Sequence, residues 1–164
     1  MIVKDASVII HLAKITLLEK SCEHFRKVIM PETVYQEVQA GKEKGYEDAF
    51  LVEMLVQQKK IEIIKADAAA VARLGEYNVH GGEAEAIVLF KQEKADYIAT
   101  DDDNVRRKAD LLSLHLLGTP SIILLLYKEK RILKDKFKES VARLQKIGWF
   151  SSGVIDKLNQ EAVA

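Results

Sequence analysis

Short apolar runs alternate with longer amphipathic segments along this 164-residue chain. Each run ends at a charged residue, a proline or a threonine, and we expect buried β-strands at residues 2–3, 28–30, 61–64 and 97–99. Helical spacing of apolar residues predicts helices at 7–19, 32–40, 47–59, 68–76, 83–93, 104–113, 121–128, 134–146 and 152–162. This alternation predicts an α/β fold, a three-layer sandwich with a mainly parallel central sheet flanked by helices.

The chain shows no internal repeat and no linker rich in Gly, Pro or Ser, so we expect one domain over 1–164, with a helical region from about 121. Its longest apolar run, Ile122 to Tyr127, is far shorter than the roughly 20 residues of a membrane span. Lys4 comes too early for a signal peptide, and the single Cys22 can form no internal disulfide. We therefore expect a cytoplasmic protein without a membrane partner.

The chain carries 25 basic and 25 acidic residues, so its net charge is zero. This balance excludes a protein that binds polyanions over its whole surface. Local excesses are still present, because residues 128–146 contain eight basic residues against three acidic ones. Arg106, Arg107 and Lys108 form a second basic group. These cations either contact a phosphate backbone or form solvated helix faces.

Several carboxylates lie where a predicted strand passes into a helix. Asp5 follows the first strand, and Asp101 to Asp103 follow the strand at 97–99. Glu83 opens a helix, and Glu37 lies one turn inside the helix that follows Pro31. If the two strands are neighbours, their carboxylates meet at the carboxyl edge of the sheet. Carboxylates this close cannot all stay ionised without a cation, and oxygen ligands favour Mg²⁺ or Mn²⁺.

Each of these acids also has a structural interpretation. Asp5 could cap the helix that follows it, and Glu83 could be favoured by a helix dipole. Glu37 alone would suit a solvated helix face, and we expect Asp103 to cap the helix through Arg106. The order of the acids along the chain, with their flanking residues, is more informative than any one of them.

Four short motifs contain these acids, at residues 2–10, 28–38, 82–87 and 97–102. The first is an apolar strand followed by Asp-x-Ser, and the second is a strand and proline followed by a helix with an acidic residue. The third is the helix opening Gly-Glu-x-Glu-Ala-Ile, and the fourth is a strand that ends in Thr-Asp-Asp. In this order the four motifs resemble those of the PIN-domain family of nucleases, which includes the VapC-type toxins.

The resemblance implies hydrolysis of RNA, which we expect to be single-stranded, by a Mg²⁺- or Mn²⁺-dependent endoribonuclease. It assigns the acidic site to Asp5, Glu37, Glu83 and either Asp101 or Asp102, of which Asp5, Glu83 and one of the two aspartates would be direct ligands. Both aspartates stay candidates, because a Thr-x-Asp pattern starting at Thr100 selects Asp102, whereas Asp101 follows Thr100 directly.

The resemblance also implies supporting groups and partners. Ser7 and Thr100 would orient the carboxylates by hydrogen bonds, and Arg106, Arg107 and Lys108 would contact the RNA. The VapC-like proteins imply a homodimer and a small antitoxin partner, whereas a stand-alone RNA-processing nuclease would lack the antitoxin.

Other functions have specific features for or against them. A catalytically weak PIN-fold module that binds protein or RNA is the alternative, because Glu83 stands where VapC-type proteins commonly carry Asp. A phosphatase of the aspartyl-phosphate type needs a second Asp two residues after the first, and Ser7 occupies that position.

We expect Trp149 and Phe150, which follow Ile147, to be core residues rather than surfaces for stacking on bases.

Overall fold

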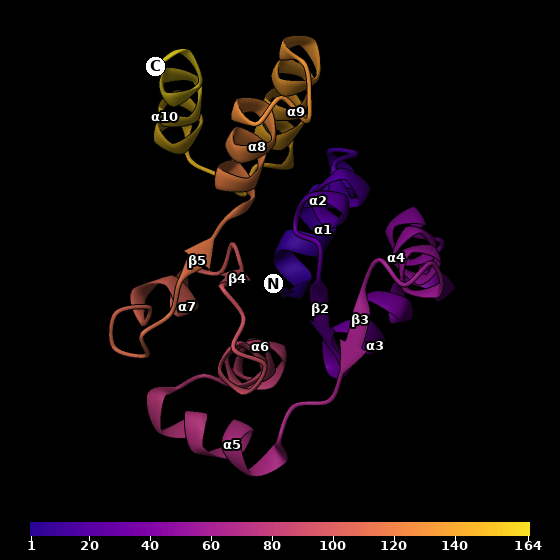
Figure 1. Cartoon of the computed structure of the whole chain (residues 1–164), viewed down its shortest axis with the longest axis vertical. Coiled ribbons are helices and arrows are strands. Elements are labelled where there is room, and N and C mark those ends of the chain that lie inside the picture. Colours follow the sequence, from indigo (N-terminus) through magenta and orange to yellow (C-terminus); the bar gives the residue numbers. More distant parts are fainter.

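A five-stranded parallel sheet forms the centre of the molecule in the computed structural model, which describes residues 1–164 (Figure 1). The strand order is β3-β2-β1-β4-β5, and every neighbouring pair is parallel. The strands are β1 (Ile2–Lys4), β2 (Val28–Pro31), β3 (Glu62–Ile64), β4 (Tyr97–Ala99) and β5 (Leu116–Leu117). The predicted α/β sandwich is therefore confirmed.

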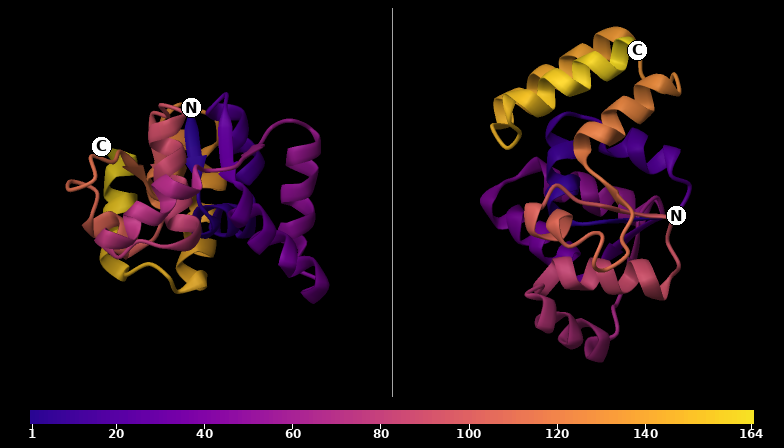
Figure 2. Two further views of the ribbon diagram at one scale, coloured as in Figure 1. Left: turned by 90° about the horizontal axis from the view of Figure 1, so that it is seen from below. Right: turned by 90° about the vertical axis from the view of Figure 1, so that its left-hand side faces the viewer.

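Helices cover both faces of this sheet. One face packs against α1 (Ala6–Lys14), α2 (Leu18–His24), α3 (Glu32–Ala40), α4 (Glu47–Gln57), α8 (Thr119–Lys128), α9 (Lys134–Ile147) and α10 (Ser152–Val163). The other face packs against α5 (Ala68–Arg73), α6 (Gly81–Gln92) and α7 (Asp103–Arg107). Figure 2 shows α9 and α10 together at one end of the molecule, with α5 and α6 at the other.

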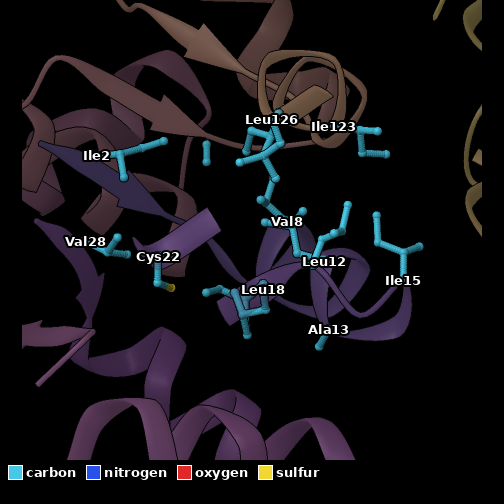
Figure 3. Packing of buried hydrophobic residues seen from close by; sticks show 14 of the residues in the cluster. Ile2, Val8, Leu12, Ala13, Ile15, Leu18, Cys22, Val28, Ile123 and Leu126 are labelled. Carbon is cyan, nitrogen blue, oxygen red and sulfur yellow. The ribbon is translucent and has the colours of Figure 1, made fainter. Parts of the chain in front are cut away.

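The strand residues divide between the two cores with the period of two that a pleated strand imposes. Ile2 and Val28 belong to the larger core, whereas Val3, Ile29 and Ile98 belong to the smaller one. Figure 3 shows Ile2 of β1 in the larger core with side chains of α1, α2 and α8. Strands buried on both faces explain why the sequence shows short, continuous apolar runs rather than alternating ones.

Lys4 is a charged residue in this larger core. Its ammonium group donates hydrogen bonds to Ser21 Oγ and, at 3.9 Å, to Cys22 Sγ. Complete burial lowers the pKa of Lys4. Burial likewise raises the pKa of Cys22, the single cysteine of the chain.

Two predicted helices differ from the structure, and one strand was not predicted. The helix predicted over 7–19 is two helices, because Thr16 has a left-handed φ of 62° between α1 and α2. Strand β5 was not predicted, since its two residues are too short for a pattern. The helix predicted over 104–113 ends at Arg107 and continues as turns.

Two short 3₁₀ helices, η1 (Gly41–Lys44) and η2 (Leu74–Tyr77), extend α3 and α5. Pro31 lies at the start of α3, and Pro120 lies in the first turn of α8. Proline is tolerated at these positions because the backbone N–H that it lacks would have no partner within the helix. None of the helices is long and apolar enough to cross a bilayer.

Candidate metal centre

The strand order places the loops after β1 and β4 side by side. From β1 the chain moves outward through β2 to β3, whereas β4 lies on the opposite side of β1. Lys4 is paired with Ala99, and the amide of Asp5 donates to the carbonyl of Ala99 at 3.1 Å. Asp5 and Thr100 therefore begin the two loops at the point where the strand order reverses, which is where parallel sheets bind ligands.

Asp5 is buried, and its carboxylate is held by three donors. Oδ1 accepts hydrogen bonds from Ser7 Oγ at 2.7 Å and from the amide of Val8 at 3.2 Å, which caps α1. Oδ2 accepts from the hydroxyl of Thr100. Burial raises the pKa of Asp5, and repulsion from Asp101 adds to this, while the bonds from Thr100, Ser7 and Val8 oppose it.

Ser7 and Thr100 each connect Asp5 to the loop after β4. Ser7 Oγ accepts from the amide of Asp101 at 3.0 Å, and Thr100 Oγ1 accepts from the amide of Asp102 at 3.1 Å. Both hydroxyls donate to Asp5 at the same time. The two loops are thus joined by hydrogen bonds, and the Asp5 carboxylate is fixed in one orientation.

Asp101 is buried, and other groups of the protein occupy both of its carboxylate oxygens. Oδ1 accepts from the amide of Thr119 at 2.7 Å, while Oδ2 accepts from Thr119 Oγ1 at 2.5 Å and from His11 Nδ1 at 2.7 Å. Its backbone carbonyl accepts from Trp149 Nε1 at 3.2 Å. The structure does not bring the Asp101 carboxylate to the pocket that the other acids line.

Asp102 has different surroundings. Its carboxylate lines the pocket, and Oδ1 accepts from the amide of Val105 at 2.9 Å. Asp102 is therefore the cap of α7, and the expectation that Asp103 caps this helix is wrong. Asp103 is the first residue inside the helix.

One pocket of about 580 Å³ holds four of the predicted acids: Asp5, Glu37, Glu83 and Asp102. Glu37 is an exposed residue of α3, and Glu83 lies half-buried in the first turn of α6. We call this space the carboxylate pocket.

Two contacts hold α3 against the first turns of α6. A Cβ atom on Gly82 would lie only 2.9 Å from Val34, so glycine permits the close approach of the two helices. The hydroxyl of Thr33 donates a hydrogen bond to Glu85. Gly81, which directly precedes Gly82, has a φ of 60°, and this left-handed conformation turns the chain into α6.

The electrostatics of the pocket are those of crowded negative charge. The pKa of Glu83 is raised from 4.5 to about 7, first by burial, then by repulsion from Asp102 and a hydrogen bond shared with it, and also by repulsion from Asp5. A bound cation would relieve this repulsion, and oxygen donors suit Mg²⁺ or Mn²⁺. No group of three His, Cys, Asp or Glu side chains is arranged to hold a metal ion in this structure.

The predicted RNA-binding cations lie outside the carboxylate pocket. Arg106 lines a separate pocket of about 420 Å³ between β5, α8 and α10, and lies 3.8 Å from Asp103. Lys108 donates to the carbonyl of Asn78 at 3.1 Å and to Asn104 Oδ1 at 2.6 Å. Arg107 is exposed.

Sequence reasoning did not place four basic or aromatic groups at the carboxylate pocket, which the structure shows among its lining residues: His11, Lys14, His80 and Trp149. Residues 7, 11 and 14 recur at helical spacing on one face of α1, so the position of Ser7 could have indicated His11 and Lys14. Trp149 gave no such signal, and the expectation that it is a core residue is wrong because 56% of it is exposed.

Comparison with known proteins gives one match. A family model described as a PIN domain matches residues 1–163. Neither the curated proteins nor the solved structures gave a match to the chain.

Proposed function

The chain belongs to the PIN-domain family, whose members are generally nucleases, and we propose that it is a metal-dependent endoribonuclease that acts at the carboxylate pocket. The observation that carries this proposal is that Asp5, Glu37, Glu83 and Asp102 line one pocket at the carboxyl edge of the sheet. Burial and the repulsion from Asp102 and Asp5, which raise the pKa of Glu83, agree with it. Clustered acids at the carboxyl edge of the sheet cost folding free energy, and a site for a divalent cation explains why they are there.

Asp5, Glu83 and Asp102 would hold Mg²⁺ or Mn²⁺, with Glu37 at the rim of the same pocket. A bound cation would supply Lewis acidity for phosphodiester hydrolysis. Ser7 and Thr100 keep the Asp5 carboxylate in a fixed orientation, and the amide of Val105 does so for Asp102. Lys14 adds a positive charge to the pocket, which favours the approach of a phosphate.

The test is Asp5→Asn, measured by Mn²⁺ titration and by cleavage of a single-stranded RNA oligonucleotide. Asparagine also caps helices well, so α1 should form and the unfolding temperature should change little. We expect wild-type protein to cleave the RNA in Mg²⁺ or Mn²⁺ and the variant to lose at least about a hundredfold in rate. Asp103→Asn, at an exposed position outside the pocket, is the matched control and should cleave normally.

Two other results have clear meanings. Binding of RNA without cleavage would support the alternative, a catalytically weak PIN-fold module. Wild-type protein that neither binds Mn²⁺ nor cleaves RNA would exclude the nuclease.

The small antitoxin and the homodimer stay predictions from the sequence. Light scattering of the purified chain would measure the oligomeric state. Co-purification with the product of a neighbouring short reading frame would support the toxin role, and cleavage by the chain without such a partner would favour a stand-alone nuclease.

A further inference from the structure

Trp149 is the only tryptophan of the chain, and it lies exposed at the carboxylate pocket. We propose that its indole stacks on an unpaired base of a single-stranded nucleic acid next to the phosphate in this pocket. Trp149 would then determine the preference of the site for unpaired strands. The inference rests on the proposed function for the nature of the substrate, but binding alone can test it.

The local structure holds the indole by its edge and leaves much of it accessible. Gly148, with a φ of 75°, ends α9 and turns the chain toward the pocket. Trp149 Nε1 then donates to the carbonyl of Asp101 at 3.2 Å, and the ring lies 5.2 Å from the His11 ring at an angle of 60°. A ring fixed in this way loses little freedom when a base stacks on it.

The next residue, Phe150, is more buried than Trp149. Phe150 is half-buried, packs edge-on against His11 at 5.4 Å and lines the separate pocket with Arg106. One aromatic side chain of the pair therefore packs inward, as in a core. The other, Trp149, leaves much of its surface exposed to solvent.

The indole of Trp149 lies at the same pocket as the acids. The hydrogen bond to Asp101 ties the indole to the residue directly before Asp102, and Trp149, Asp102 and Asp5 line the same pocket. A base on the indole would thus belong to a nucleotide beside the phosphate at the acids. Lys14 lines this pocket as well, so a cation is available to the backbone.

The carboxylate pocket continues into a second space, which gives a strand room to extend. A neighbouring pocket of about 400 Å³ shares Ile10, Lys14 and Glu37 with it and adds Lys44, Tyr46 and Asp48. Cations together with exposed aromatic rings are typical of surfaces that bind single strands. A duplex keeps its base faces stacked, so the indole could engage it poorly.

The experiment uses the fluorescence of Trp149, which reports on this position alone because the chain has no other tryptophan. Wild-type protein in EDTA is titrated with a six-nucleotide single-stranded RNA, with the same strand annealed to its complement, and with an abasic strand of equal length. We expect quenching by the single strand, weaker quenching by the duplex and none by the abasic strand.

Binding of labelled RNA, followed by anisotropy, compares three variants. Trp149→Ala should weaken binding of the single strand about tenfold, and Trp149→Phe should recover part of this loss. Phe50→Ala is the matched control, because Phe50 is similarly exposed at 55% but lies on α4 and does not line either pocket. It should bind as wild type does.

The failure of this inference can be distinguished from the failure of the proposed function. Equal affinities of wild type, Trp149→Ala and Trp149→Phe, with no quenching, would overturn the role of Trp149 even if the protein cleaves RNA. Quenching and weaker binding by Trp149→Ala would support it even if no cleavage is seen. If Trp149→Ala does not fold, the wild-type titrations and Trp149→Phe decide.

Discussion

Asp101 and Asp102 are neighbours in the sequence, but the protein uses their carboxylates in different ways. A buried carboxylate is tolerated only where donors replace its water shell. Thr119 and His11 provide these donors for Asp101, whereas Asp102 has one backbone donor and faces the pocket. Asp101 therefore supports the loop after β4, and Asp102 is left free for a ligand.

This difference predicts that alanine substitutions at the two positions have unequal effects on stability and on metal binding. Asp101→Ala should lower the free energy of unfolding by about 3 kcal/mol, because it leaves the buried donors of Thr119 and His11 without an acceptor. Asp102→Ala should cost only about 1 kcal/mol, the value of a helix cap, but should abolish tight Mn²⁺ binding. Urea unfolding and Mn²⁺ titration measure the two effects, and equal destabilisation would contradict this assignment.

The pKa of Glu83 predicts how the metal-free protein responds to pH. Between pH 4.5 and about 7 the unfolded chain has lost this proton while the folded protein keeps it. The unfolded state then binds fewer protons, so stability falls as pH rises through this interval. The stabilisation by the retained proton is fully present below pH 4.5 and is lost above the folded-state pKa of about 7.

Glu83→Gln isolates this effect, since glutamine does not titrate. Relative to the variant, wild type in EDTA should lose about 1–2 kcal/mol of unfolding free energy over the interval, less than the full conversion of the shift because the side chain is partly exposed to solvent. Urea unfolding at a series of pH values measures the difference. Parallel curves for the two proteins would show that Glu83 titrates normally.

Among the elements, the end of α9 and the start of α10 set the position of Trp149. Gly148 is in the left-handed region, and a Cβ atom there would meet no other group, so Gly148→Ala would suffer backbone strain alone. We expect it to destabilise the protein by about 1 kcal/mol.

Gly153 offers a matched substitution of opposite sign. It lies in the first turn of α10, and a Cβ atom would only meet Ser151 Oγ at an ordinary 3.9 Å. Gly153→Ala should therefore stabilise the protein by about 0.5 kcal/mol through helix propensity. Thermal unfolding of both variants tests this pair, and a shared direction of change would contradict the assigned backbone conformations.

Elements that are determined by neighbouring residues in the sequence could be predicted, whereas elements that depend on contacts distant in the sequence could not. The strand after Met1 and the helix after Pro31 are set by apolar runs and a proline, and both were predicted close to their observed bounds. The break at Thr16 was missed because a β-branched residue seldom adopts positive φ, and here the packing of α1 and α2 imposes it. Strand β5 was missed because it depends on pairing with β4.

The same distinction holds for the site. Asp5, Glu83 and the pair Asp101 and Asp102 lie where helices begin, so the sequence could select them as candidates, and the structure brings Asp5, Glu83 and Asp102 to one pocket. The choice between Asp101 and Asp102 depends on Thr119, and the place of Trp149 depends on the packing of the last helices. Such long-range contacts leave no local pattern.

At the scale of the whole molecule, helices α8 to α10 contribute buried side chains to the larger core. Leu126 of α8 is fully buried and shares this core with Val8 and Leu12 of α1 (Figure 3). The helix that begins at Asp5 and the helices that carry Trp149 to the pocket therefore depend on the same packing. The sequence predicted one domain over 1–164. We infer that the carboxylate pocket forms only when the sheet with α1 and the helices α8 to α10 are both folded.

This view predicts the result of truncating one core side chain. Leu126→Ala should lower the free energy of unfolding by about 3 kcal/mol, because it removes a buried side chain and leaves a cavity between α8 and α1. Leu133→Ala, at a position that is 79% exposed before α9, is the control and should change stability by less than about 0.5 kcal/mol. Urea unfolding is followed by circular dichroism and by the fluorescence of Trp149. If the chain folds as one unit, the midpoint of Leu126→Ala falls by the same amount in both signals, with an unchanged slope. Separate transitions in the two signals would mean that α8 to α10 unfold independently of the sheet, and the carboxylate pocket would then not require them.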